Sequence, residues 1–235
     1  MLAREVILNI KNRAILYGML LGDGCLKTKL HTKKDESQST YYEYVLCHSV
    51  NQLEYLEYKR NLFHSIMGGK LPKIHFENVR LGDKIHQSCR FSRCNKYFRI
   101  IHKRLYSLNN KKYFTRKILD YLTPEAIAIW YMDDGGLKKS KRSDGSISSC
   151  QMFLFTYFSE EEADTTLNYF SDVWGIQGKK YLYFKNNSWY LGFNTTEGRK
   201  FESLIKDYII PSMKYKLPNS YNPRVLDTLI GDDIV

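Results

Sequence analysis

Two aspartates, each followed directly by glycine at the end of a short apolar run, are the residues of this sequence with the clearest chemical potential. The first run is AILYGMLLGDG, residues 14–24, and the second is AIAIWYMDDGG, residues 126–136. A carboxylate at the carboxyl end of a helix disfavours folding, because unpaired carbonyls already give that end partial negative charge. The same oxygens suit a hard divalent cation such as Mg²⁺. Asp23 and Asp134, placed beside phosphates, would therefore fit metal-dependent phosphodiester hydrolysis.

A single Asp-Gly pair usually marks no more than a turn after a helix, but here the pair recurs at the end of a second apolar run. We expect both apolar runs to be buried helices that end at their glycines. Thr123-Pro124-Glu125 supplies an N-cap, a first-turn proline and a first-turn acid for the second helix. Gly18 and Gly22 leave a flat stripe on the first helix. If the two helices pack together, Asp23 and Asp134 meet at a pseudo-twofold axis.

The segments around these helices also repeat, which predicts an α+β fold. After each apolar run come two strand-like stretches, a helix, two more strand-like stretches and a further helix. Ser-x-x-Gln at residue 49 and Ser-x-x-Glu at residue 159 are capping boxes that open the middle helices. The predicted strands are 25–33, 41–48, 70–77 and 84–93 in the first half, and 137–142, 150–158, 178–185 and 188–194 in the second. The predicted helices after the strands are 49–67, 95–107, 159–174 and 196–209.

Alternation along the strands separates an apolar face from a polar, basic and aromatic one. A solvated sheet face explains any one such strand, but three of them in two repeating halves favour a surface for nucleic acid. A twisted antiparallel ribbon fits the DNA major groove, and the hairpin tip 138–146 is basic enough to contact phosphates. The expected DNA contacts are Lys27, Lys29, His31, Lys33, Arg90, Ser92, Lys138, Lys139, Lys141, Arg142, Lys179, Tyr181, Tyr183 and Lys185.

Composition agrees with a nucleic-acid partner and excludes several classes. The net charge is +11 with an isoelectric point near 9.3, typical of proteins that bind polyanions. Aromatic residues make up 14% of the chain, too many for a disordered protein, and no apolar run approaches the roughly 18 residues of a membrane span. The five cysteines contain no CxxC pair, so we expect an intracellular, reduced protein without a disulfide framework.

The segments Leu16–Gly24 and Ile127–Gly135 resemble the two copies of the motif that names the LAGLIDADG homing endonucleases, in their single-chain form. The resemblance covers about residues 10–222 and includes MDDGG at 132–136 and PSMKYKLPN at 211–219, which resemble intron-encoded members. It implies two αββαββα repeats, residues 1–117 and 118–235, whose antiparallel sheets form a saddle over DNA. It also implies a monomer that cuts both strands of a long asymmetric target with Mg²⁺ or Mn²⁺ and leaves 3′ overhangs.

The resemblance also assigns site residues. Asp23 and Asp134 would be metal ligands and catalytic, with the carbonyls of Gly22 and Asp133 as neighbouring backbone ligands. The active-site lysines would be Lys112 and Lys216, positioning water or offsetting charge on the phosphate. A shift of the alignment by one or two residues would give these roles to Lys111 and Lys214.

The sequence departs from the family motif at two positions. Ile129 stands where the first copy has Gly18, so we expect less close or less symmetric helix packing. Asp133 occupies a position that is usually small, where it either tunes the metal site or caps the helix. The two strands of the target could then be cut at unequal rates.

Other functions stay open at this point. A protein of this fold could be an RNA-binding maturase of its own intron, or a DNA-binding protein without catalysis. His86, Cys89, Cys94 and His102 could be drawn as a zinc site, although their spacing matches no common finger. We do not expect this sequence to lie within an intein, because it begins with Met rather than Cys or Ser and ends in Asp-Asp-Ile-Val. Abundant Lys, Asn, Ile and Tyr fit an organellar or other AT-rich source.

Overall fold

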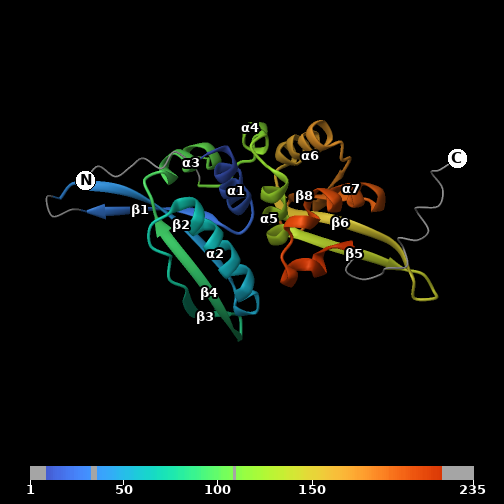
Figure 1. Cartoon of the computed structure of the whole chain (residues 1–235), viewed down its shortest axis with the longest axis horizontal. Helices are drawn as coiled ribbons and strands as arrows, with labels where there is room; N and C mark the ends of the chain where they lie inside the picture. Colours follow the sequence, from blue (N-terminus) through green and yellow to red (C-terminus); the bar gives the residue numbers. More distant parts are fainter. Residues whose placement is uncertain (1–8, 33–35, 108–109, 219–235) are drawn as a thin grey trace. The chain divides into compact units, whose positions relative to one another are not determined.

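The computed structural model describes residues 9–32, 36–107 and 110–218. The chain divides into two compact units, Met1–Asp133 and Asp134–Val235. Each unit contains one four-stranded antiparallel sheet with helices packed on it (Figure 1). The predicted α+β fold with repeated αββαββα units is confirmed. Among the described residues, none of the helices has the length and apolar character needed to cross a membrane.

The first unit begins with a buried helix and builds its sheet from two hairpins. The strand order is β1-β2-β4-β3, so the two inner strands join the hairpins. Its elements are α1 (Ile10–Leu21), β1 (Cys25–Thr32), β2 (Gln38–Ser49), the 3-10 turn η1 (Val50–Gln52), α2 (Leu53–Met67), β3 (His75–Leu81), β4 (Lys84–Cys94), α3 (Phe98–Leu105) and α4 (Arg116–Leu119). Helix α5 (Pro124–Asp134) follows, and all of it except Asp134 belongs to this unit.

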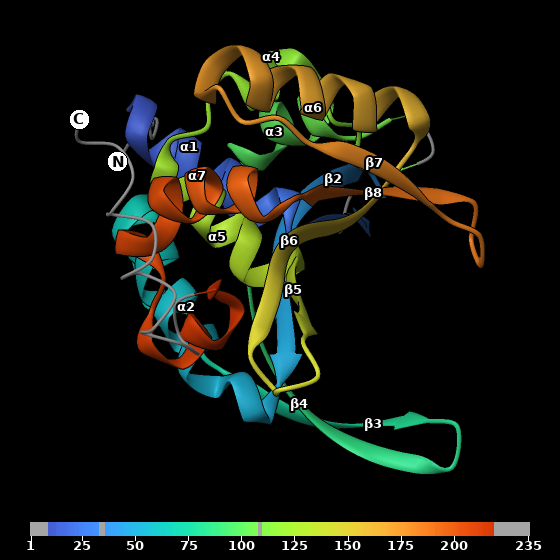
Figure 2. The ribbon, with the colours of Figure 1, turned by 90° about the vertical axis from the view of Figure 1, so that its right-hand side faces the viewer.

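The second unit repeats this arrangement with the strand order β5-β6-β8-β7. Helices α6 and α7 pack on the sheet (Figure 2). The elements are β5 (Gly135–Lys141), β6 (Ile147–Phe158), α6 (Glu160–Trp174), β7 (Lys179–Tyr183), β8 (Ser188–Phe193), α7 (Thr195–Ile205) and two 3-10 segments, η2 (Lys206–Tyr208) and η3 (Pro211–Lys216).

The capping box predicted before α6 is present, whereas the one predicted before α2 is replaced by a different cap. At α6 the capping box forms, since the Ser159 hydroxyl accepts from the Glu162 amide and the Glu162 carboxylate accepts from the Ser159 amide. At residue 49 the prediction was only partly right. The Ser49 hydroxyl caps the 3-10 turn η1, accepting from the Asn51 amide at 3.4 Å, and the α-helix begins at Leu53.

The third strand lies later in the chain than predicted, at His75–Leu81 rather than 70–77. Gly68 and Gly69 both adopt positive φ, 63° and 73°, a conformation that glycine tolerates. The chain then runs without regular structure until His75, which pairs with Arg90 of β4. The basic and apolar residues at 70–74 therefore belong to a loop.

The core of the first unit is built around α1 and α5, as the apolar runs predicted. Every residue from Ala14 to Leu21 and from Ala126 to Met132 is buried. The helices approach most closely at Gly18, where an added Cβ would lie 2.9 Å from the Cα of Ala126 and collide with its carbonyl oxygen. The helices therefore pack closely at Gly18 in the first motif, although the second motif has Ile129 at the equivalent position.

We expect Gly18→Ala to destabilise the protein by about 1–3 kcal/mol, because the backbone of Ala126 cannot yield as a flexible side chain would. Urea unfolding would measure the change. Gly198→Ala is the matched control, since a Cβ there would make ordinary contact, 3.4 Å from Cγ of Met152, within helix α7. It should leave stability unchanged or raise it by up to about 1 kcal/mol through helix propensity. Equal stability of Gly18→Ala and wild type would contradict the close approach.

Candidate functional site

The carboxyl end of α1 holds Asp23 in a fixed turn. The Gly22 amide donates to the Gly18 carbonyl at 3.4 Å and the Gly24 amide donates to the Met19 carbonyl at 3.0 Å. The Asp23 side chain is 44% exposed. A carboxylate thus stands at the end of a buried helix with access to a ligand.

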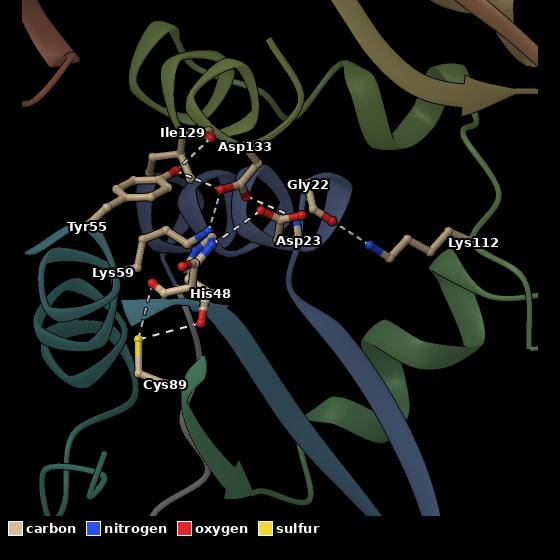
Figure 3. A network of polar contacts seen from close by, with 10 residues as sticks. Gly22, Asp23, His48, Tyr55, Lys59, Cys89, Lys112, Ile129 and Asp133 are labelled. Atoms are coloured by element: carbon tan, nitrogen blue, oxygen red, sulfur yellow. Dashed lines mark hydrogen bonds and ion pairs between the residues drawn. The ribbon is translucent and has the colours of Figure 1, made fainter. Parts of the chain in front are cut away.

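Asp133, from α5, lies beside Asp23 and contacts its backbone (Figure 3). Its Oδ2 accepts a hydrogen bond from the Asp23 backbone amide at 3.0 Å, and its Oδ1 accepts from the Tyr55 hydroxyl at 2.8 Å and from Lys59 Nζ at 2.6 Å. The side chains of Asp133 and Lys59 are both fully buried. A buried ion pair is tolerated only with further polar partners, and here both oxygens of Asp133 accept hydrogen bonds from other groups of the protein.

Tyr55 and Lys59 reach Asp133 because both lie on the buried stripe of α2, four residues apart and followed by Phe63. Lys59 Nζ also lies 4.6 Å from the centre of the Tyr55 ring. Burial, and then the negative charge of Asp133, raise the pKa of Tyr55 well above its usual range. The hydroxyl therefore keeps its proton and remains a donor.

His48, at the end of β2, completes the group. Its Nδ1 lies 3.5 Å from Asp23 Oδ2, and its imidazole is buried against the Tyr55 ring, with centroids 5.2 Å apart. Ligand atoms of Asp23, His48 and Asp133 all lie within 4.8 Å of one another, and in the described part of the chain no other group of three or more His, Cys, Asp or Glu does so.

These donors fit a divalent cation. A carboxylate and a backbone carbonyl suit Mg²⁺, and an imidazole adds compatibility with Mn²⁺ and softer metals. Asp133 is the weakest candidate ligand of the three, since both of its oxygens already accept hydrogen bonds from protein groups. Its contacts suit it to orient Asp23, the role of an outer-shell partner in metal sites.

Lys112 lies at the same turn, on the opposite side of Gly22 from His48 (Figure 3). Its Nζ donates to the Gly22 carbonyl at 2.6 Å. The segment is held by the bridge between Tyr106 and Lys112 and by the Tyr113 amide, which donates to the Leu105 carbonyl at 2.7 Å. Lys111 is exposed. Of these two lysines, Lys112 is the one that contacts the first motif.

The second unit holds Asp134 and Lys216. Asp134 Oδ2 accepts from the Thr156 hydroxyl at 2.7 Å, so a side chain of β6 orients this carboxylate. Lys216 ends η3, which packs against β5, the strand that follows Asp134 directly. Lys216 is half-buried and Lys214 is exposed.

Most of the expected DNA contacts in the first unit share one face of its sheet. The register places Lys27, Lys29 and His31 of β1 beside β2, and places Arg90 and Ser92 of β4 on the other side of β2. Two acids on this face, Glu43 and Glu77, contact some of these side chains. Glu43 contacts Lys29 at 2.6 Å and accepts from the Ser92 hydroxyl at 2.7 Å, and Glu77 pairs with Arg90. Lys33 lies outside the described residues.

In the second unit, Lys138, Lys179, Tyr181 and Tyr183 lie on the sheet face opposite the helices. Lys139 alternates with Lys138 and so points to the other face, opposite Cys150. Lys141 follows a register shift after Ser140, and Arg142 is in the hairpin turn, where its amide donates to the Ser146 carbonyl. Lys185 follows β7 and is exposed.

The zinc alternative finds no support in the described residues. Cys89 is buried, with its sulfur 3.6 Å from the carbonyls of His48 and Ser49, whereas Cys94 is exposed. The His102 ring stacks on Tyr106 at 4.6 Å. No cluster of metal-ligating side chains includes any of these groups among the described residues.

Sequence reasoning missed three members of the site, namely His48, Tyr55 and Lys59. One signal was available for Lys59, because a lysine on the apolar stripe of an amphipathic helix needs a buried anionic partner. The unusual acid Asp133 is that partner. His48 had no comparable signal, since its neighbours in space come from distant parts of the sequence.

Comparison with known proteins is consistent with this geometry. A model of the LAGLIDADG DNA endonuclease family matches residues 13–201. Protein RecA of Mycolicibacterium flavescens is 26% identical over 211 residues, covering 86% of this chain and 45% of the relative. Cytochrome b mRNA maturase bI2 of Saccharomyces cerevisiae is 28% identical over 232 residues, covering 90% of this chain and 48% of the relative. The chain thus spans about half the length of these relatives.

Among solved structures, the homing endonuclease I-WcaI bound to its DNA recognition sequence matches with a TM-score of 0.70 and 23% identity, covering 89% of this chain and 87% of that one. I-GzeII in complex with its DNA target matches with a TM-score of 0.52 and 13% identity, over 89% and 87% of the two chains. These similarities show the fold. The chain belongs to the LAGLIDADG DNA endonuclease family, and its fold is that of the homing endonucleases.

Proposed function

We propose that this protein is a site-specific homing endonuclease that hydrolyses both strands of a long, asymmetric DNA duplex with Mg²⁺ or Mn²⁺, leaving 3′ overhangs. The observation that carries the proposal is the Asp23 turn. A half-exposed carboxylate is held there by a buried network, with a cationic Lys112 at the adjoining carbonyl. Membership of a family of DNA endonucleases supports it.

The residues divide into ligands and supports. Asp23 with the carbonyl of Gly22, and Asp134 with the carbonyl of Asp133, would hold divalent cations, which when bound would lower the pKa of attacking water and stabilise the leaving oxygen. Asp133 fixes the Asp23 backbone through the amide hydrogen bond, and Thr156 fixes Asp134. Lys112 and Lys216 would place positive charge beside the phosphate, where negative charge develops. We assign the sheet faces to the two half-sites of the duplex.

The direct test is selection of cleaved sites from a randomised duplex DNA library, with Mg²⁺ and with EDTA. Wild type should cut a single long motif only when the metal is present. The double variant Asp23→Asn, Asp134→Asn should cut nothing. If wild type cuts no member of the library under any condition, the endonuclease proposal fails.

The two lysines allow a matched comparison within each unit. We expect Lys112→Met and Lys216→Met each to slow cleavage of the selected target by about 10²-fold while changing its Kd by less than about threefold, because the charge acts on the transition state. Lys111→Met and Lys214→Met are the controls, since both lysines are exposed neighbours. Single-turnover cleavage and gel-shift binding would separate the effects. Equal losses in binding and cleavage would make Lys112 or Lys216 a phosphate clamp.

A second candidate function is intron RNA maturase, favoured by the similarity to two cytochrome b mRNA maturases bI2, from Saccharomyces cerevisiae and Debaryomyces hansenii. Addition of the purified protein to a host intron transcript should then accelerate splicing, and Asp23→Asn should retain that effect. An unchanged splicing rate would remove this candidate. That the protein is a monomer, that it acts inside the cell, and that it comes from an organellar or other AT-rich genome remain predictions.

A further inference from the structure

The sheet of the second unit has one face covered by helices and one aromatic face. Met152 and Phe193 mark the covered face, since Met152 lies beside Gly198 of α7 and the Phe193 ring contacts those of Phe170 and Phe201. Residues that alternate with them point the other way. We call these the aromatic face: Phe153, Phe155, Tyr157, Tyr181, Tyr183 and Tyr190.

The rings of the aromatic face hold one another in place. Centroids are 5.1 Å apart for Phe155 and Tyr190, 5.4 Å for Tyr181 and Tyr190, and 6.1 Å for Tyr157 and Tyr183. Each pair falls in the range of favourable aromatic contacts. A hollow of about 220 Å³ opens between Phe155, Tyr157, Tyr183, Ser188 and Tyr190.

Much of this apolar surface is in contact with solvent. The exposed fraction is 40% for Phe155, 60% for Tyr157 and 41% for Tyr183. A contiguous exposed apolar patch in a folded protein commonly marks a binding surface. Its occupant must therefore offer apolar groups to these rings.

Charge indicates that the occupant is a polyanion. The four strands of this sheet contain no aspartate or glutamate, while Lys138 and Lys179 lie on the same face as the rings and the exposed Lys185 follows β7. The open face of the first unit differs, because two of its basic side chains, Lys29 and Arg90, are paired with Glu43 and Glu77. Its strands also carry no comparable ring cluster among the described residues. The two sheets therefore offer different chemistry to nucleic acid.

Apart from Lys138 and Lys179, the aromatic face has few groups that could read guanine or adenine. Its strands contain no arginine and no asparagine, and Gln151 is their one side-chain amide. In the major groove, guanine is read mainly by arginine or lysine and adenine by asparagine or glutamine, whereas thymine alone presents an apolar group, its C5 methyl. Resting on the proposed function, we propose that the aromatic face binds one half-site of duplex DNA by packing Phe155, Tyr157, Tyr183 and Tyr190 against thymine methyls, with Lys138 and Lys179 on the phosphates.

This mode of contact would also separate DNA from RNA. Uracil lacks the C5 methyl, and the deep, narrow major groove of A-form RNA does not admit such side chains. The aromatic face would then be a determinant of both sequence and nucleic-acid type. The half-site that the second unit binds should therefore be rich in thymine.

The test uses the full chain and duplexes enriched by binding selection in Ca²⁺ or EDTA, so that cleavage plays no part. Each half-site is synthesised with deoxyuridine in place of thymine, which removes only the methyl groups. We expect one half-site to respond, with Kd rising about fourfold for each methyl in contact, as follows from the free energy of burying a methyl-sized apolar group. In Phe155→Ser and in Tyr183→Ser, the difference in Kd between thymine and deoxyuridine duplexes should be smaller than in the wild type, because one of the four rings is removed. Tyr208→Ser, which removes an exposed ring outside the sheet, should retain the wild-type difference.

The outcomes separate the two proposals. If no duplex is enriched, the DNA-binding function fails and the thymine inference fails with it. If a duplex is enriched but deoxyuridine binds as well as thymine in both half-sites, the thymine inference alone is wrong. A loss of binding to unpaired DNA or RNA probes in the serine variants, without a methyl effect, would instead assign the hollow to an unstacked base. Circular dichroism and urea unfolding would verify that every variant is folded.

Discussion

Asp23→Asn and Asp134→Asn should each reduce cleavage of the selected duplex by at least roughly 10²- to 10³-fold while leaving its Kd within a few-fold of wild type. Asparagine keeps the size of the side chain but removes the negative charge that a divalent cation requires. The loss falls on charge stabilisation near the reacting phosphate, where one preorganised group is typically worth this much. Gel-shift binding in Ca²⁺ and single-turnover cleavage in Mg²⁺ would measure the two quantities.

Asp120→Asn provides the matched control. Asp120 is an exposed acid of the first unit that pairs with Arg116 at 2.7 Å and lies outside the candidate site. Its replacement should change neither cleavage nor binding by more than about twofold, as expected for a surface ion pair. Retention of double-strand cutting by either Asp23→Asn or Asp134→Asn would refute a reaction that needs both carboxylates.

Lys59→Met should lower the free energy of unfolding by about 3–5 kcal/mol. The change leaves the carboxylate of Asp133 buried without its cation, and an uncompensated buried charge is strongly destabilising. The double variant Lys59→Met, Asp133→Asn should recover most of this loss. Asparagine is neutral, its oxygen can still accept from the Asp23 amide, and its NH2 group can donate to the Tyr55 hydroxyl, which itself donates to the Ile129 carbonyl at 3.1 Å. Urea unfolding of the single and double variants would show the difference.

An exposed lysine tests whether the effect belongs to the buried pair. Lys103→Met, on the solvent side of α3, should change stability by less than about 0.5 kcal/mol. If Lys59→Met were as mild as Lys103→Met, the carboxylate of Asp133 would have another source of compensation. If the double variant were no more stable than the single one, the hydrogen-bond network would matter more than the charge balance.

The parts of the fold that rest on local patterns were predictable from the sequence. The apolar runs before Asp23 and Asp134 are buried helices, and alternation separated the more buried from the more exposed face in β4 and β7. In β1 both faces are exposed after Leu26. Capping at Ser159 also followed from four residues read together. Strand boundaries that depend on pairing with a distant strand were harder to predict from the sequence. The start of β3, for example, depends on the pairing of His75 with Arg90.

The interior of the site was not predictable in the same way. Lys59 and Asp133 are 74 positions apart in the sequence, on two different helices, and nothing local to either residue identifies the other. The sequence did mark Asp133 as an exception to its motif, but left open whether it tunes a metal or caps a helix. The structure adds a role that neither alternative named, since this carboxylate neutralises a buried lysine and holds the backbone of Asp23.

The Lys59–Asp133 pair also limits how this chain can be rebuilt. Asp133 and Gly22 occupy equivalent positions of the two motifs. A symmetric protein made by duplicating the first motif would therefore place glycine where Asp133 stands and leave Lys59 buried without a carboxylate. Grafting a second motif from another family member would meet the same difficulty, unless its residue at this position were acidic or Lys59 were replaced together with it. Chimeras of this scaffold should thus exchange residues 59 and 133 as one unit.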